Sequence, residues 1–349
     1  MKEKIDEQTA IQALQDWLQK IPFIQVVRSV KQNQQPGGPD FQADLRIGDR
    51  SIKLLVEVKS NGQPRLARQA VYALKNWLAD RPDTYGIFIA PYISQEAAAI
   101  CQEEGIGYLD LAGNCHLSFD TVYIHQQSYP NSLAQRRDHR SLYSPKAERI
   151  LRVLLTDPQH SWKTETLANA AGVSLGQVAN VKKLLTDREW LLSEATGIRL
   201  SAPRALLDEW SQQYKFRRNK VNDYYAMAEV SEIEYQLAEA CQLKNINYAL
   251  TGFSGAARLA PAVRYQRGMA YLDGGLGDLV DTLGWKSVES GANISLLAPY
   301  DEGVFYGTRD VNGVQVASPV QVYLDLQSYR GRGQEAAQAV RKEIEKAWL

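Results

Sequence analysis

Two short amphipathic segments near the middle of the chain place the tightest limit on its fold. Apolar residues recur at helical spacing in Thr164–Ala171 and again in Leu175–Arg188, and residues 172–174 (Gly-Val-Ser) separate the two runs. Glycine permits a tight turn, and a serine directly before a helix is a preferred cap. Leu167 of the first run and Val178 of the second must then bury against each other. The sequence therefore predicts two short helices that pack across one another.

Elements on both sides extend this pair into a compact module. Ser144-Pro145 is typical of a helix start, and Ala147–Leu155 follows with apolar residues at helical spacing. After the pair, Trp190–Leu192 and Ile198–Leu200 predict a two-stranded hairpin. This order of elements, with the pattern LANAAGVSLGQVANVKKLL, closely resembles winged-helix transcription regulators.

The resemblance implies that the amino end of the second helix of the pair points at DNA. Helical spacing turns Val178, Val181 and Leu185 inward and leaves polar side chains on the outer face. Glutamine and asparagine suit adenine edges, whereas lysine and arginine suit phosphate or guanine. The predicted DNA-binding residues are Lys163, Ser174, Gln177, Asn180, Lys182, Lys183 and Arg199. The alternative is a helical scaffold for protein contacts.

The charge distribution agrees with a DNA-binding centre. The chain carries no net charge, but residues 140–220 contain fourteen Lys or Arg against eight Asp or Glu. The rest of the chain is therefore acidic overall. A basic module between acidic flanks is typical of nucleic-acid binding within a larger protein, and such binding requires no cofactor.

The segment before this module alternates helices and strands. Its predicted order is a helix (Gln8–Leu18), two strands (Phe41–Ile47 and Ile52–Lys59), a helix (Arg65–Leu78), a strand (Tyr85–Ala90), a helix opened by Ser94 and a strand (Tyr108–Leu111). This order predicts an α/β domain with a mixed sheet.

Polar residues on the first two of these strands form a candidate metal site. Period-two alternation puts Glu57 and Lys59 on one face of their strand, next to a carboxylate of the neighbouring strand. Two carboxylates that meet at one point hold Mg²⁺ against a phosphate, and a lysine polarises the attacking water. The combination resembles the PD-(D/E)XK nuclease superfamily, including archaeal Holliday-junction resolvases. By that resemblance, Gln69 in the next helix and Glu7 in the first helix are further site residues.

The first carboxylate of this candidate site has two alternatives. A two-residue turn at 48–49 sets Asp40 opposite Glu57, whereas a longer loop brings Asp44 there. Both aspartates have the same pleat parity, so periodicity does not choose between them. The resolvase-like spacing favours Asp44. The assigned residues are thus Asp44 and Glu57 for Mg²⁺, and Lys59 and Gln69 for catalysis in an active nuclease. A relic that grips DNA without cutting it is the other interpretation, because a regulator that cuts its own operator is harmful.

The segment after residue 213 mixes helices with short strands near 247–251, 269–273, 294–297 and 314–317. A Gly/Ser turn at 252–255, followed by a strand that ends in Asp273, resembles the nucleotidyltransferase fold. Active enzymes of that fold need two carboxylates, usually one residue apart, for the metal that carries the nucleotide. Here Gly274-Gly275 follow Asp273. The resemblance is therefore to a degenerate domain that has lost nucleotide transfer.

Five further motifs extend the resemblance over nearly the whole chain: EVKSNGQPR, LDLAGNCHL, TGFSGAARLAP, SPVQVYLDL and GRGQEAA. With the winged helix, they resemble AbiEi-like antitoxins of type IV abortive-infection toxin–antitoxin systems, in a long form with a restriction-endonuclease-like domain in front. Membership implies a repressor of its own operon in phage defence and a counterweight to a nucleotidyltransferase toxin. The implied partners are double-stranded operator DNA and a toxin encoded nearby, which such antitoxins need not contact directly.

Together these features predict an α/β multidomain protein and a sequence-specific transcriptional regulator, with a Mg²⁺-dependent DNA endonuclease as the alternative function. The predicted parts are a PD-(D/E)XK nuclease-like domain (1–135), a winged helix-turn-helix domain (141–212) and a degenerate nucleotidyltransferase-like antitoxin domain (213–349). Winged-helix repressors often bind DNA as dimers, so a homodimer is a candidate assembly, although no coiled-coil repeat supports it.

The compartment follows from cysteine usage and hydropathy. Three widely spaced cysteines argue against a disulfide framework, and no apolar run approaches the roughly 20 residues that cross a bilayer. The charged amino terminus does not resemble a signal peptide. We therefore expect a cytoplasmic protein without a membrane contact. Cys115, between Asn114 and His116, is expected to be a partly buried thiol at a strand end rather than a nucleophile.

Overall fold

The computed structural model describes residues 7–32, 38–79, 81–119, 121–127, 129, 142–329 and 331–348. The chain divides into two compact units, Met1–Asp138 with Leu185–Glu189 and His139–Leu184 with Trp190–Leu349. The modules expected at 141–212 and 213–349 thus fall almost entirely within one unit. Within the described ranges, no helix is long and apolar enough to cross a membrane.

The first unit contains a seven-stranded sheet whose strands lie side by side in chain order, β1 to β7. The strands are β1 (Ile24–Gln32), β2 (Phe41–Ile47), β3 (Arg50–Val58), β4 (Thr84–Ala90), β5 (Gly107–Asp110), β6 (Cys115–Phe119) and β7 (Val122–Gln126). The neighbours β3, β4 and β5 run parallel, and the other pairs are antiparallel. The sheet is therefore mixed, and it extends the predicted set of strands by β1, β6 and β7.

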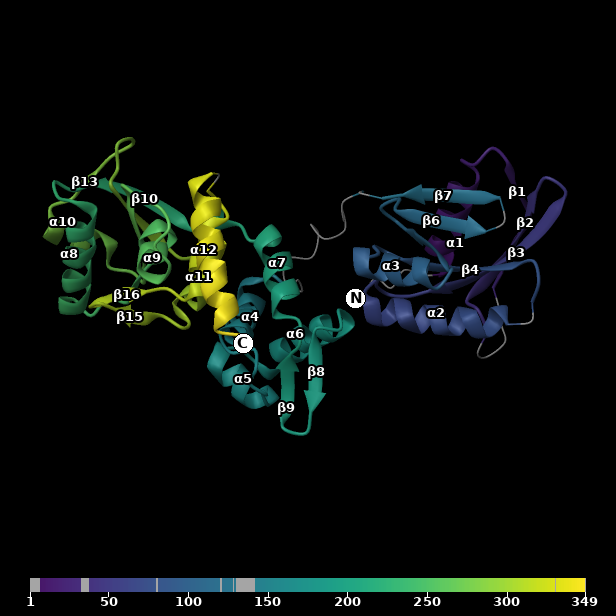
Figure 1. The fold of residues 1–349 in the computed structure, drawn as a ribbon, viewed down its shortest axis with the longest axis horizontal. Coiled ribbons are helices and arrows are strands. Elements are labelled where there is room, and N and C mark those ends of the chain that lie inside the picture. The colour runs from purple at the N-terminus through teal and green to yellow at the C-terminus, as the bar shows by residue number, and fades with distance from the viewer. Residues whose placement is uncertain are drawn as a thin grey trace. The chain divides into compact units, whose positions relative to one another are not determined.

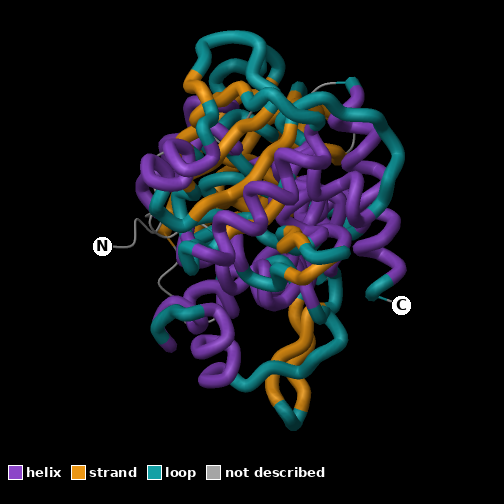
Figure 2. The backbone as a smooth tube through the Cα atoms, turned by 90° about the vertical axis from the view of Figure 1, so that its left-hand side faces the viewer, coloured by secondary structure: helices purple, strands orange, loops and turns teal. Residues whose placement is uncertain are grey.

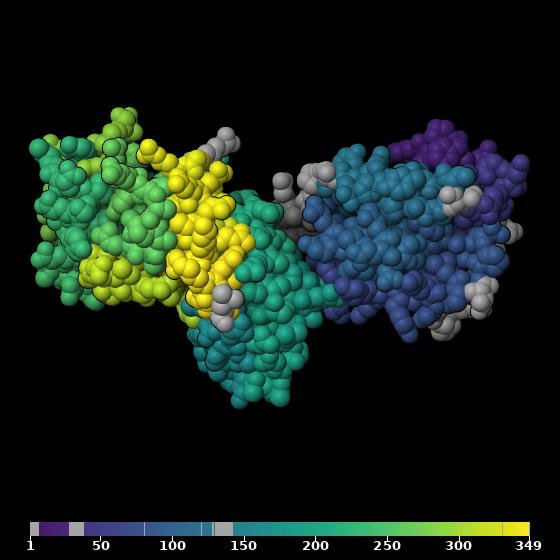
Figure 3. Space-filling view, in the orientation of Figure 1, coloured from purple at the N-terminus to yellow at the C-terminus, as the bar shows by residue number. Residues whose placement is uncertain are grey.

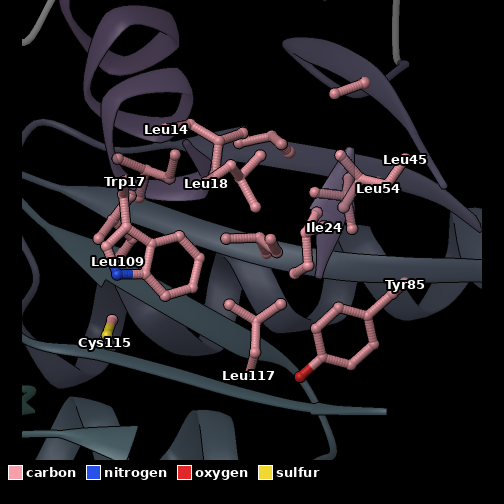
Figure 4. Packing of buried hydrophobic residues seen from close by; sticks show 14 of the residues in the cluster. Leu14, Trp17, Leu18, Ile24, Leu45, Leu54, Tyr85, Leu109, Cys115 and Leu117 are labelled. Atoms are coloured by element: carbon pink, nitrogen blue, oxygen red, sulfur yellow. The ribbon is translucent and has the colours of Figure 1, made fainter. Parts of the chain in front are cut away.

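Helices cover both faces of this sheet (Figure 1). They are α1 (Glu7–Leu18), α2 (Pro64–Leu78) and α3 (Gln95–Glu103). Leu14 of α1 packs with Leu54 of β3 on one face (Figure 4). Strand alternation turns Leu55 to the other face, where it packs with Leu74 of α2. Each fully buried leucine stabilises this arrangement by roughly 1.5–3 kcal/mol. The expected serine cap is also present, because Ser94 Oγ accepts from Ala97 N at 3.2 Å.

The second unit begins with a helical module and a hairpin. Its elements are α4 (Pro145–Thr156), α5 (Thr164–Ala171), α6 (Leu175–Asp187, of which residues 175–184 belong to this unit), β8 (Leu191–Glu194) and β9 (Gly197–Leu200). The two strands pair antiparallel and form a narrow hairpin at the lower edge of Figure 2. Trp162 adds to it, because its backbone exchanges hydrogen bonds of 2.8 and 2.9 Å with Ile198. The order of helices and strands is the predicted one.

A second seven-stranded sheet follows, in the order β13-β10-β14-β12-β11-β16-β15. Its strands are β10 (Lys220–Tyr225), β11 (Tyr248–Leu250), β12 (Gly268–Leu272), β13 (Lys286–Ser287), β14 (Ile294–Ala298), β15 (Arg309–Val311) and β16 (Val314–Val316). The accompanying helices are α7 (Pro203–Gln213), η3 (Phe216–Arg218), α8 (Val230–Leu243), α9 (Gly252–Leu259), α10 (Leu276–Leu283), η4 (Glu302–Phe305), α11 (Pro319–Leu326) and α12 (Arg332–Lys346). Sequence reasoning missed β10, β13 and β15.

The last helix holds the helical module and the second sheet together (Figure 3). Trp348, just after α12, donates from Nε1 to the backbone oxygen of Leu155 in α4 at 2.9 Å. Arg341 of α12 pairs with Asp208 of α7 at 2.5 Å. The last helix therefore connects α4 and α7 to the carboxyl-terminal part of the unit.

Candidate functional site

The register of β2 and β3 decides which aspartate lies next to Glu57. Ile47 pairs with Arg50 across a two-residue turn, and Phe41 pairs with Val56 at the other end. Gly48 in that turn has φ +58°, a value that favours glycine. The next pair outward sets Asp40 opposite Glu57. This is the short-turn alternative that the sequence left open.

Asp44 lies within β2, whereas Asp40 comes directly before that strand. Asp44 pairs with Lys53, four residues and about 13 Å along β2 from Asp40. The preference for Asp44 as the neighbour of Glu57 is therefore wrong, because it required a longer loop than the chain forms. Asp40 is fixed in place by the strand itself: its Oδ2 accepts from Val58 N at 2.6 Å.

Glu57 is a buried carboxylate held beside a cation. Its exposed fraction is 6%, and Lys59, on the same face of β3, donates from Nζ to its Oε1. Burial raises the pKa of Glu57, the hydrogen bond from Lys59 lowers it, and the nearby charge of Asp40 raises it again. Two carboxylates and a lysine thus converge at the carboxyl end of β3. This donor set fits Mg²⁺, which is often bound through one or two carboxylates and substrate phosphates.

The assignment of Gln69 and Glu7 to this site stays a prediction. Gln69 is on the exposed side of α2, whose buried side faces the sheet through residues such as Ala70. Glu7 does not join Asp40 and Glu57, since no three His, Cys, Asp or Glu residues among those described form a metal-binding group. The cluster is therefore the trio Asp40, Glu57 and Lys59.

The LDLAGNCHL motif forms a self-capped turn. Asp110 is buried, and its Oδ1 accepts from the backbone of Ala112, Gly113 and Asn114 at 2.9 Å each. Cys115 begins β6 as a fully buried free thiol, and burial raises its pKa to about 11. The expected thiol at a strand end is present, and it is more deeply buried than expected.

The helix pair in the second unit packs as its apolar pattern predicts. Leu167 of α5 and Val178, Val181 and Leu185 of α6 are all buried. Gly172 ends α5 with φ +60°, in the left-handed region that favours glycine. The expected serine cap is present: Ser174 Oγ accepts from Gln177 N at 3.3 Å.

The predicted DNA-binding residues differ in how far they reach solvent. Exposed are Lys163, Ser174 and Lys183, and half-buried are Gln177, Asn180, Lys182 and Arg199. Arg199 is engaged on the hairpin, where it pairs with Glu194 at 2.6 Å. Gln177 is set back, and within the described residues its Nε2 is buried without a hydrogen-bond partner. Gln177 therefore offers less of its amide to solvent than its sequence position suggests.

Sequence reasoning missed two residues at the amino end of α6. The exposed Lys146 of α4 joins Asn169, Ser174 and Gln177 around a hollow of about 490 Å³. Leu175, the first residue of α6, is largely exposed. It lies three residues before Val178 and so fits the apolar period, which gave no signal that it faces outward.

Part of the basic surplus of residues 140–220 lies in the interior and does not contribute to an outer surface. Arg149 pairs with Asp301 at 2.7 Å, and the guanidinium of Arg152 is buried. Arg218 pairs with the buried Glu148 at 3.0 Å. These arginines join the helical module to the rest of its unit.

The Gly/Ser turn of the second sheet has no carboxylate from β12 beside it. β11 and β12 are antiparallel, and Asp273 lies next to Asn247 at the end remote from the turn. The acid that does reach the turn is Asp325 of α11, whose Oδ2 accepts from Thr251 Oγ1 at 2.5 Å. Asp325 is fully buried, which raises its pKa, and it also accepts from Tyr214 at 2.7 Å.

The motifs of the carboxyl-terminal part supply internal hydrogen bonds. In SPVQVYLDL, Gln321 donates to Asp325 at 2.9 Å and accepts from Arg152 at 2.6 Å. In TGFSGAARLAP, Arg258 pairs with the buried Glu234 at 3.0 Å, which also accepts from Tyr265. These residues hold the second unit together.

Comparisons with known proteins match separate parts of the chain. No curated protein matches this chain. Two solved structures do, one described as "Structure of EndoMS in apo form" (16% identity, 31% of this chain and 46% of that chain, TM-score 0.24). The other is "Structure of EndoMS-dsDNA2 complex" (19% identity, 29% and 43%, TM-score 0.21). The chain thus spans less than half the length of either. Residues 199–346, less than half of this chain, match the family described as "Transcriptional regulator, AbiEi antitoxin, Type IV TA system".

Proposed function

We propose that this protein is a sequence-specific DNA-binding regulator, and the antitoxin of a type IV toxin–antitoxin pair, in which α4–α6 and β8–β9 act as a winged helix. The observation that carries this proposal is the capped helix pair α5–α6, followed by a projecting hairpin. Its outer face offers Lys163 and Lys183 to phosphates and Asn180 to a base edge. The family match of residues 199–346 supports the antitoxin assignment.

A reporter placed behind the DNA upstream of this protein's own coding sequence tests the regulator. We expect the wild-type chain to repress it and Asn180→Ala to relieve repression, because the amide would no longer reach its base. Gln242→Ala, which removes an exposed amide from α8, is the matched control and should repress normally. Full repression by Asn180→Ala would show that α6 is not the reading element. Equal expression with and without the wild-type chain would refute operator binding.

The antitoxin assignment has its own test. We expect a neighbouring gene to encode a nucleotidyltransferase whose expression arrests growth, and co-expression of this chain to restore growth. If the product of the neighbouring gene arrests growth whether or not this chain is co-expressed, the antitoxin assignment is wrong. The proposal of a DNA-binding regulator would not be affected by that result.

The trio Asp40, Glu57 and Lys59 favours a second candidate function, Mg²⁺-dependent DNA cleavage by the first unit. Asp40 and Glu57 would hold the ion, which would neutralise charge on a bound phosphate. Lys59 would stabilise charge on the phosphate from its place beside Glu57. These three residues lie together, as the chemistry requires, and Asp44 lies outside.

Incubation of the full chain with plasmid DNA and Mg²⁺ tests this second function. We expect cleavage that Asp40→Asn and Glu57→Gln abolish and that the control Asp44→Asn retains. If the wild-type chain leaves the plasmid intact, the trio is a relic. If Asp44→Asn also abolishes cleavage, the assignment of Asp40 as the ligand is wrong.

A further inference from the structure

The amino end of α6 presents an apolar side chain that the core does not use. Leu175 is 53% exposed, whereas Leu167, Val178 and Val181 of the same helix pair are buried. A lone exposed leucine is unremarkable on a general surface. This one occupies the first turn of the helix whose amino end, in a winged helix, enters the major groove.

The residues that follow Leu175 on α6 have small side chains or point elsewhere, so that they do not cover it. Residues four apart share one face of a helix, so Leu175, Ala179 and Lys183 form a single stripe, and all three are exposed. Gly176 is exposed beside them and carries no side chain. Along this stripe, a DNA groove would meet first the branched apolar side chain of Leu175, then the small side chain of Ala179, and then the positive charge of Lys183. The polar side chain of Gln177 is half-buried to one side.

Only one base presents an apolar group in the major groove. Thymine carries a C5-methyl there, whereas the other groove-facing atoms of the four base pairs are mainly hydrogen-bond donors and acceptors. Leu175 has no hydrogen-bonding group, and water leaves both apolar groups when they meet. We propose that Leu175 is a specificity-determining residue that recognises a thymine by its methyl group. This inference rests on the proposed DNA binding by α6.

The recognised methyl can be removed without any change in base pairing. The experiment first selects bound sequences from a library of random duplexes with the full wild-type chain. Each thymine of the selected motif is then replaced, one at a time, by deoxyuridine. At one or two positions we expect about a fourfold loss of affinity, the change that corresponds to burial of one methyl-sized group. The same replacement should not affect Leu175→Ala, which already lacks the contact.

The matched control is Leu243→Ala, which removes an equally large side chain that is 81% exposed on α8. It should keep the wild-type response to deoxyuridine. A wild-type chain that selects a motif but binds the thymine and deoxyuridine duplexes equally well would overturn this inference and leave DNA binding intact. Selection of no motif at all would overturn the proposed function and this inference with it.

Discussion

Arg152 of α4 donates from both Nε and Nη2 to Oε1 of Gln321 in α11, at 3.0 and 2.6 Å, in the interior of the second unit. Both residues are almost fully buried, and Gln321 passes the connection on to Asp325 beneath the Gly/Ser turn. A guanidinium that leaves water must find acceptors in the protein. The helical module therefore folds against α11 of the same unit and does not form a separate domain.

Gln321→Leu should destabilise the second unit. The leucine fills the space but removes the acceptor of Arg152 Nε and Nη2 and one of the donors to Asp325 Oδ1, at a cost of about 3 kcal/mol. Chemical denaturation of the full chain, followed by circular dichroism, measures this loss. The control Gln327→Leu changes an exposed amide just after the same helix and should alter the free energy of unfolding by less than about 0.5 kcal/mol. Equal effects of the two changes would contradict the connection.

Two glycines that flank the turn of the helix pair should respond in opposite ways to alanine. Gly172 has φ +60°, so Gly172→Ala should cost about 1 kcal/mol and lower the thermal midpoint by about 2–4 °C. Gly176 lies in α6 with space around it, so Gly176→Ala should stabilise the helix by about 0.5 kcal/mol. Thermal unfolding of the two variants provides the comparison. Destabilisation by both to the same extent would argue against the left-handed turn.

Glu57 should make the first unit less stable as pH rises. Its folded pKa is raised by burial, so the unfolded chain loses its proton first, and native stability falls from the ordinary pKa of 4.5 upward through the raised value. Glu57→Gln removes this titration. The thermal midpoint of the variant should therefore rise relative to that of the wild type as pH increases above 4.5. The opposite trend would mean that Lys59 outweighs burial and that the folded pKa is lowered.

The apolar pattern was sufficient to predict the helix pair, because Leu167, Val178 and Val181 recur at helical spacing on either side of a glycine turn and are all buried. The pattern was not sufficient to identify the first carboxylate of the trio. Asp40 and Asp44 have the same strand parity, and only the length of the turn at Gly48 decides which of them lies opposite Glu57. Loop geometry at that point, and not periodicity, selects Asp40.

Charge and exposure were the hardest properties to predict. In the sequence, Arg149 and Arg152 add to the positive charge of residues 140–220. In the structure they are bound by Asp301 and Gln321, which lie about 150 residues or more further along the chain. No local pattern records such a pairing. Leu175 presents the converse case, an apolar residue that fits the helical period of the core but faces solvent at the first turn of its helix.

The most direct test of the account is the affinity of the full chain for its selected duplex, and for a scrambled duplex of the same composition, as salt concentration is raised. We expect the selected duplex to bind at least about 1,000-fold more tightly than the scrambled one. Lys183→Ala should reduce the slope of log affinity against log salt by about one, and Lys244→Ala, which changes an exposed lysine just after α8, should leave the slope unchanged. Equal affinity for both duplexes, with the same slope for all three proteins, would contradict DNA recognition by α6.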